Sequence, residues 1–251
     1  LNAIDGLKDF ATLPNGGAVR GMISDGRRVI TVSGRQVYST TASGVTTSIG
    51  GLASDERVSM DYNRQTPSPQ CAIVADGEVH IVQGSSITKL TDPDLPPPIS
   101  VVFFNGYFVF LLADGRFFLS EIDGTGVDAL DFATAEANPD GLVAGVRRQS
   151  ELWLFGDSSI EVWGVSGADF PMERLPGAFI DVGCSARNSV AVLDRSVMWV
   201  APDNTVRLSR AYSPEAVSPE VLTLKIRDVE DKTTLVANTY SMGGHHYYVL
   251  T

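Results

Sequence analysis

Hydrophobic and polar residues along this chain recur in one short unit: an apolar strand, a tight polar turn, and a second strand of alternating residues. The turns include Asp25-Gly26, Asn105-Gly106 and Gly243-Gly244. Such pairs favour two-residue hairpin turns, because these turns need positive φ angles that glycine adopts without steric cost. The unit occurs six times, at residues 19–32, 71–82, 101–112, 142–155, 190–200 and 235–250.

The spacing of these hairpins predicts the fold. Their turn centres lie near residues 26, 77, 106, 149, 195 and 244, so the mean step is about 44 residues, the length of one four-stranded propeller blade. We therefore predict an all-β fold, a β-propeller of six blades, with five and seven as alternatives and one blade incomplete or closed by the N-terminal segment. Further strand candidates follow the hairpins at Gln36–Ser39, Ser86–Leu90, Arg116–Ser120, Ser159–Trp163 and Thr205–Leu208.

The chain reads as a single domain over residues 1–251, because a repeat array of this length commonly stays undivided. It starts at Leu1 rather than Met and stops inside a strand-like run, so we expect a fragment of a longer protein. Helical periodicity is scarce, and only Asp131–Glu136 predicts a short helical turn. Three longer connections stand out: the stiff, proline-rich Asp92–Pro98, Ser166–Phe179 and Ala211–Pro219.

The charge balance argues against a nucleic-acid-binding role. The net charge is −11, and no basic run exceeds two residues, as in Arg27-Arg28 and Arg147-Arg148. Nonspecific affinity for DNA comes from Lys and Arg that displace counterions from phosphates. We therefore predict that the isolated chain binds duplex DNA weakly or not at all, although a basic patch assembled in three dimensions stays open.

Acidic residues are the only catalytic candidates, because propeller glycosidases need carboxylates that converge on one site. The chain contains two groups of carboxylates that are close in sequence. The sequence cannot place either group around a propeller axis, and acidic turn residues are expected at this net charge. We therefore predict that the chain is not an enzyme and assign no catalytic residue. The two groups are Asp123, Asp128 and Asp131, and Glu151, Asp157 and Glu161.

Histidine and cysteine offer no metal or cofactor site. His245 and His246 are adjacent, so on a strand they point to opposite faces and cannot chelate one ion together, and His80 lies in an alternating strand. Cys71 and Cys184 are far apart in the sequence and belong to no Cys-x-x-Cys pair. We predict two buried free thiols, no metal and no cofactor.

Trp153 and Trp199 occupy equivalent positions in successive hairpins, and Trp163 lies on the strand between them. This equivalence favours packing of the tryptophans between blades over stacking on a ligand.

From about Val101 to Tyr212, unusual sequence pieces follow one another in a fixed order. They are Phe104–Phe110, Asp131–Glu136 with Pro139-Asp140, Glu151–Gly156, Ile160–Trp163, Phe170-Pro171 with Arg174 and Gly177, Gly183-Cys184 with Ala186, and Ser196–Ala201 with Asp203. In this order and spacing they resemble the phage stabilisation family, the packaged-DNA stabilisation or tail accessory proteins of short-tailed phages. Residues 1–70 and 213–251 match less distinctly, and family members are considerably longer.

The resemblance implies a virion structural protein that assembles late, in the host cytoplasm, under the portal and its adaptor ring. There it would form a ring, close the DNA exit, help to retain the packaged genome and give the tail needle or tailspikes a platform. The resemblance carries over no catalytic residue, no cofactor and no membrane role, and a prophage is an alternative source of the gene. A negative surface suits this role, because it lets DNA slide during ejection.

Interblade loops vary without disturbing packed strands, so the three long connections named above are the expected contacts with neighbouring proteins. The alternative function is a propeller that binds or cleaves glycans. Converging carboxylates or aromatic platforms in one open pocket would favour that alternative, and an extended flat interface would favour the structural role.

Overall fold

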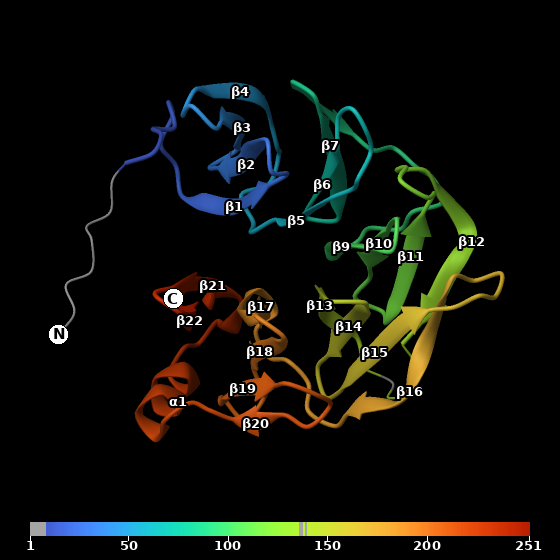
Figure 1. Ribbon diagram of the computed structural model, residues 1–251, viewed down its shortest axis with the longest axis vertical. Coiled ribbons are helices and arrows are strands. Elements are labelled where there is room, and N and C mark those ends of the chain that lie inside the picture. Colours follow the sequence, from blue (N-terminus) through green and yellow to red (C-terminus); the bar gives the residue numbers. More distant parts are fainter. Residues whose placement is uncertain (1–8, 136–137, 139) are drawn as a thin grey trace. The chain divides into compact units, whose positions relative to one another are not determined.

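The computed structural model describes residues 9–135, 138 and 140–251. They form five antiparallel four-stranded sheets, each a meander whose strands pair in sequence order, and one two-stranded sheet (Figure 1). The chain divides into two compact units between Thr91 and Asp92. The prediction of an all-β propeller is confirmed, with five four-stranded blades, one of the alternatives to six.

The N-terminal unit contains two blades, which share one apolar core. Ile30 and Val37 of the first blade and Ile73 and Val82 of the second are almost completely buried in it. Blade 1 comprises β1 (Val19–Ser24), β2 (Arg28–Ser33), β3 (Gln36–Thr41) and β4 (Thr46–Gly51), and blade 2 comprises β5 (Ser59–Tyr62), β6 (Gln70–Ala75), β7 (Glu78–Gln83) and β8 (Ser86–Lys89).

The C-terminal unit contains three blades and a final hairpin. Blade 3 comprises β9 (Ser100–Phe104), β10 (Tyr107–Leu111), β11 (Arg116–Ser120) and β12 (Val127–Thr134). Blade 4 comprises β13 (Leu142–Arg148), β14 (Glu151–Gly156), β15 (Ile160–Val165) and β16 (Met172–Ile180). Blade 5 comprises β17 (Ala191–Leu193), β18 (Ser196–Val200), β19 (Val206–Ser209) and β20 (Glu215–Ala216), and the hairpin is β21 (Ala237–Met242) and β22 (His245–Leu250).

The six sequence hairpins are not equivalent in the structure. Five of them join the first and second strands of a sheet, whereas the copy at residues 71–82 joins β6 to β7, the second and third strands of blade 2. The first hairpin of that blade is β5–β6, with residues 63–69 as its loop. This offset accounts for the uneven spacing of the turns around residue 77. The sixth hairpin, β21–β22, forms the two-stranded sheet, with Gly243 and Gly244 at φ 59° and 78°.

The tryptophans pack between blades, as predicted. Trp153 and Trp199 are completely buried in the core shared by blades 4 and 5, where the Phe155 and Trp199 rings meet edge to face with centroids 5.5 Å apart. Trp163 lies on the other side of blade 4, in the core shared with blade 3, and its ring meets that of Phe117 with centroids 5.0 Å apart.

The structure corrects the helical prediction. Residues 131–134 belong to strand β12, and Ala135 follows that strand. The helical turn predicted at Asp131–Glu136 is therefore wrong for residues 131–135, and Glu136 lies outside the described residues. The aromatic ring of Phe132 stacks on Phe118 of the neighbouring strand, 5.2 Å between centroids, and favours the strand.

A helix that the sequence did not predict, α1 (Glu220–Arg227), follows blade 5. Leu222 and Ile226 lie on one face of it and pack against the blade 5 core. No helix in the described part of the chain is long and apolar enough to span a membrane. Two 3-10 turns complete the unit, η1 (Arg187–Ser189) and η2 (Lys232–Thr234).

Candidate interaction surfaces

Glu151, one of the candidate catalytic carboxylates, is held in a network between blades 4 and 5. Its Oε2 accepts hydrogen bonds from Arg148 Nη1 at 2.8 Å and from Trp153 Nε1 at 2.9 Å, and its Oε1 accepts from the Tyr212 hydroxyl at 2.6 Å. Burial by itself raises the pKa of Glu151, but the three donors outweigh burial and hold the pKa below its usual value. Glu151 therefore acts as an anionic anchor for the two blades.

Glu161 repeats the arrangement on the opposite face of the same sheet. Its Oε2 accepts a hydrogen bond from Trp163 Nε1 at 2.9 Å, and the Glu161 side chain is buried. Trp153 pairs with Val162 across the two strands, so Trp153 and Trp163 project to opposite faces. Glu151 and Glu161 are therefore separated by the sheet and do not converge on one site.

The remaining candidates are equally dispersed. Asp157 lies in the exposed turn between β14 and β15, and Asp123 lies in the turn after β11 with a φ of 50°. Asp128 and Asp131 are exposed on β12, within the stretch where the pairing of β12 with β11 shifts in register. Among the residues that the structure describes, no group of three or more His, Cys, Asp or Glu could hold a metal ion.

The cysteines are the two buried free thiols that the sequence predicts, and the three histidines lie on strands. Cys71 and Cys184 are free and buried, and burial raises the pKa of each thiol to about 12. His245 and His246 lie on β22, where His246 Nδ1 is 2.7 Å from the Ser241 hydroxyl. His80 is buried on β7, and burial lowers its pKa.

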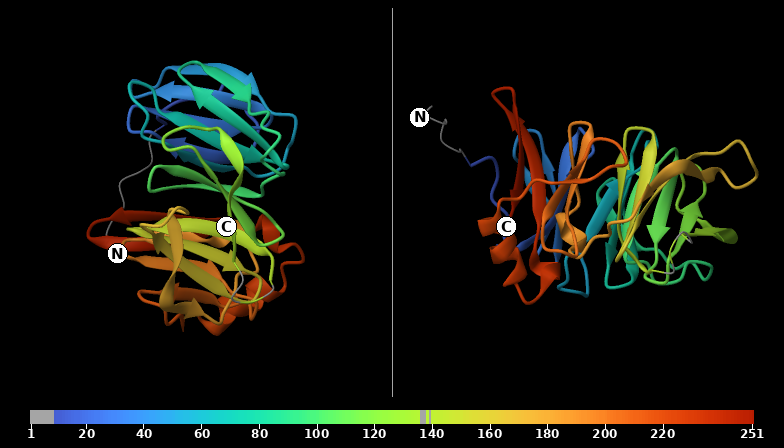
Figure 2. Two further views of the ribbon diagram at one scale, coloured as in Figure 1. Left: turned by 90° about the vertical axis from the view of Figure 1, so that its right-hand side faces the viewer. Right: turned by 90° about the horizontal axis from the view of Figure 1, so that it is seen from below.

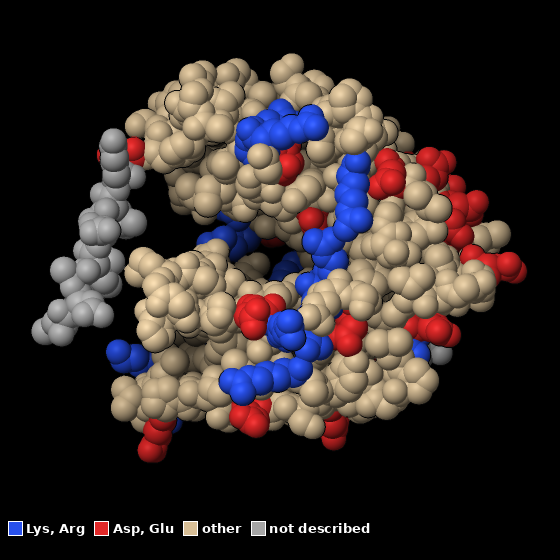
Figure 3. Space-filling model, in the orientation of Figure 1, with Lys and Arg blue, Asp and Glu red and all other residues tan. Residues whose placement is uncertain are grey.

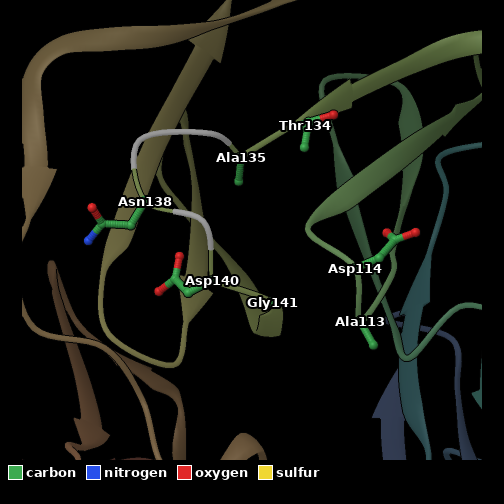
Figure 4. Close-up of a pocket in the computed structure, with 7 residues that line it drawn as sticks. All are labelled: Ala113, Asp114, Thr134, Ala135, Asn138, Asp140 and Gly141. Carbon is green, nitrogen blue, oxygen red and sulfur yellow. The ribbon is translucent and has the colours of Figure 1, made fainter.

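A pocket in the C-terminal unit lies between blades 3 and 4 (Figure 4). Its two carboxylates already have partners: Asp140 accepts from the backbone N–H groups of Ser158 and Ser159 at 2.9 and 3.0 Å, and Asp114 pairs with Arg116 at 2.8 Å. The carboxylates thus hold the turns around the pocket. Its lining comprises Ala113, Asp114, Thr134, Ala135, Asn138, Asp140 and Gly141.

The first expected contact segment, Asp92–Pro98, connects β8 to β9, in agreement with the sequence. Asp92 is not a free surface group, because its side chain accepts hydrogen bonds from the backbone N–H of Val127 at 3.0 Å and of Asp94 at 3.1 Å. Asp94 and Pro97 are exposed, and Pro98 is buried. The available surface of the segment therefore centres on residues 93–97.

Ser166–Phe179 is not simply a connection, and this expectation needs correction. Its second part lies in β16, the outer strand of blade 4, because Met172 and Ala178 are buried and the strand pairs with β15. Residues 166–171 form the loop before β16, and this loop projects away from the blade in Figures 1 and 2. The exposed apolar side chain of Phe179, 39% accessible, belongs to the same outer edge.

Ala211–Pro219 also contains a strand, the two-residue β20, at the outer edge of blade 5. Tyr212 is tied to Glu151, and Ser218 accepts a hydrogen bond from the backbone N–H of Val206 at 3.0 Å. Ser213, Glu215 and Val217 are exposed. The surface that this segment offers to a partner therefore lies between Tyr212 and Ser218, which are both held by hydrogen bonds.

Strand β22 has features of an interaction edge that the sequence analysis missed. The hairpin β21–β22 has two strands where every other sheet has four, and second strands such as β14 and β18 are almost wholly buried whereas β22 is largely exposed. Its signal in the sequence is the absence of any charged residue from 235 to 251. The hairpin extends past blade 5 in Figure 2.

The outer strands of the five blades carry features that discourage pairing with another strand, whereas β22 carries none. The pairing of β4, β12 and β16 with the neighbouring strand of the blade contains a shift in register. Strand β8 is short and contains Lys89, and the two-residue strand β20 lies between Pro214 and Pro219. In contrast, β22 pairs with β21 in an unbroken register. Its exposed side chains, Tyr247 and Val249, lie beside Tyr240, whose ring stacks on Tyr247 at 4.8 Å.

Comparison with known proteins decides the family. A family model described as Bacteriophage P22 Gp10, beta-propeller, matches residues 1–251. The chain belongs to this phage stabilisation family. Its members are phage structural proteins, so this phage stabilisation protein has a structural role in the virion. No curated protein sequence gives a significant match.

Solved structures similar to this phage stabilisation protein are propellers of other kinds. A catalytically inactive virginiamycin B lyase from Staphylococcus aureus, with quinupristin, gives a TM-score of 0.63 at 11% identity, covering 95% of this chain and 79% of the lyase. A streptogramin B lyase gives 0.54 at 14% identity, covering 83% and 72%. PorZ of Porphyromonas gingivalis gives 0.51 at 14% identity over 82% of this chain, which spans 28% of PorZ. At these identities the likeness concerns the fold alone.

Proposed function

We propose that this protein works at the head-to-tail junction of a short-tailed phage, where it closes the portal exit, helps to retain packaged DNA and provides a platform for tail components. The observation that carries the proposal is the family match over the whole chain. The protein would act as part of a ring under the portal and its adaptor, in contact with the tail needle or tailspike proteins.

The proposed role is that of an assembly component without catalytic activity. This is supported by the candidate carboxylates Glu151 and Glu161, which lie on opposite faces of blade 4 and are bound to tryptophan N–H groups. A glycan-cleaving propeller would instead need an acid and a second carboxylate at one cleft. The exposed outer edges of blades 4 and 5 and strand β22 suit contacts with proteins.

Closure of the exit would be mechanical, because the chain as a whole is acidic. A net charge of −11 opposes tight binding along a duplex and favours sliding and release of DNA. Assembly in the host cytoplasm, with the gene carried by a phage or prophage, is part of the same proposal.

The test is deletion of the gene from the phage or prophage that carries it, followed by complementation with the intact gene. We expect filled heads that lose their DNA to nuclease and lack tail components in electron micrographs, and normal particles after complementation. Particles that keep nuclease-resistant DNA and complete tails, but fail to bind or degrade a host surface glycan, would overturn the junction role in favour of the glycan propeller.

A further inference from the structure

Blades 4 and 5 bring four arginines together at one end of the C-terminal unit. Arg148, the last residue of β13, donates from Nε to the carbonyl oxygen of Arg195 and from Nη2 to that of Arg210, both at 2.6 Å. Arg147 precedes Arg148 on the strand. One buried guanidinium thus fixes the backbone of two further arginines that lie far away in the sequence.

The charge of Arg148 is already compensated. The side chain is buried, pairs with Glu151 at 2.8 Å and lies over the ring of Trp153, 5.5 Å from its centroid. Burial and bonding of this kind leave Arg148 no freedom to bind a ligand. Arg148 is therefore the support of the cluster.

The other three arginines differ from Arg148, which is buried and paired with Glu151. Arg147, Arg195 and Arg210 are exposed, and no ion pair forms at any of them within residues 9–135, 138 and 140–251. The nearest carboxylate in sequence is the exposed Asp194. Figure 3 shows basic side chains over the region of β13 and β17–β19, with acidic side chains among them. Arginines that do pair with a carboxylate are Arg28, Arg35, Arg116, Arg148, Arg207 and Arg227.

The arrangement suits a ligand with spaced negative charges. Arg147 and Arg148 are neighbours on β13 and project to opposite faces of the strand, whereas Arg195 and Arg210 belong to blade 5, where Arg148 binds their backbone. The cluster contains arginine only, whose planar fork matches phosphate oxygens in a bidentate manner. Charges spread over two blades suit a backbone of successive phosphates better than one compact anion.

We infer that Arg147, Arg195 and Arg210 form a contact site for the phosphate backbone of duplex DNA. The choice of DNA among phosphate polymers rests on the proposed function, which puts the protein beside the exit path of the genome. The contact is weak and local, since three arginines act within an acidic protein. It would touch DNA at the exit and release it readily during ejection, while closure of the exit stays mechanical.

The test is fluorescence anisotropy of a labelled duplex of about 30 base pairs with the purified chain between about 50 and 200 mM NaCl. Three phosphate contacts predict a slope of about −2.7 in log K against log salt, which corresponds to an affinity about 40-fold lower at the higher salt. In the variant R147Q/R195Q/R210Q we expect at least about a tenfold loss of affinity at low salt and a slope near zero.

The matched control is R35Q/R116Q/R227Q, which removes the same charge from three arginines that each pair with an aspartate. We expect the control to weaken binding by less than about threefold. Equal weakening in the two triple variants, or no binding of wild type at low salt, would overturn the site. If the test variant melts differently from wild type, the single variants replace it, each expected to lower the slope by about 0.9.

A polyglutamate peptide tests whether the arginine site binds the acidic surface of a partner protein instead of DNA. Binding of the peptide without binding of DNA would overturn the DNA site in favour of a protein partner. Because these measurements use the isolated protein, their failure leaves the junction role untouched, and that role is tested separately by the gene deletion.

Discussion

Tyr212 donates its hydroxyl hydrogen to Glu151 Oε1 at 2.6 Å, although the two residues are 61 positions apart. The bond joins the start of β14 in blade 4 to the segment that follows β19 in blade 5. Trp153 packs beneath it, with its ring 6.0 Å from that of Tyr212. Adjacent blades are thus held by a charged group with fixed donors as well as by apolar contact.

Glu151→Gln should lower the free energy of unfolding at neutral pH by about 2 kcal/mol, because Arg148 would lose its counter-charge in a mostly buried place. The folded-state pKa of Glu151 lies below its unfolded value, so its contribution is complete above about pH 4.3 and is lost as the pH falls through the folded pKa. Urea unfolding at several pH values should show the difference between variant and wild type shrinking in acid. Glu215→Gln, at an exposed position, is the control; a constant difference down to acid pH would contradict the assignment.

Gly183→Ala should destabilise the chain by about 2 kcal/mol or more, because a Cβ there would lie 2.2 Å from the backbone of Asp157, which cannot yield as a side chain would. Gly167→Ala provides the control, since nothing lies within 4 Å of its added Cβ. Thermal unfolding compares the two. Equal melting temperatures would mean that the turn at Asp157 is less closely packed than the structure indicates.

Cys71 and Cys184 should resist thiol reagents in the folded protein at about pH 8, because burial raises each thiol pKa to about 12 and blocks access. Both thiols should react after unfolding in guanidinium chloride. Ser85→Cys, which adds a thiol at an exposed turn, should react at once. Rapid labelling of wild type in the folded state is the contrary result.

Charge changes at exposed positions of the three contact segments should leave stability almost unchanged and still block tail assembly. Suitable variants are Asp94→Lys, Asp169→Lys and Ser213→Lys, which avoid the anchored Asp92 and Tyr212. We expect a change in melting temperature below about 2 °C, together with filled heads that leak DNA. If these variants assemble normally and Ser150→Lys, in the turn before β14, does not, the contact face has been misassigned.

Strand β22 should mediate self-association of the purified chain, because its edge has no charge, proline or irregular register to prevent pairing. Sedimentation velocity at about 100 µM should reveal larger species that disappear in Val249→Lys, where a lysine blocks edge pairing. Val221→Lys introduces the same charge on the exposed side of α1 and should have no effect. A monomeric wild-type chain would show that the edge needs a different partner strand.

Local signals in the sequence were sufficient for the class of fold. Turns such as Asn105-Gly106 are encoded by neighbouring residues, because positive φ angles there depend on glycine and asparagine themselves. The packing of the tryptophans between blades followed from the same repeat pattern, and the free cysteines followed from their separation and the absence of a Cys-x-x-Cys pair. The blade boundaries did not, since the hairpin at residues 71–82 looks like the others although it joins the second and third strands of blade 2.

Tertiary structure decided the rest, because contacts between distant residues leave no periodic trace in one sequence. In α1 the apolar residues Leu222, Leu224 and Ile226 alternate as in a strand, and packing of Leu222 and Ile226 against blade 5 selects the helix. The pairing of Glu151 with Tyr212 depends on how blade 4 meets blade 5. The arginine cluster likewise exists only because Arg148 binds two carbonyl groups across that same boundary.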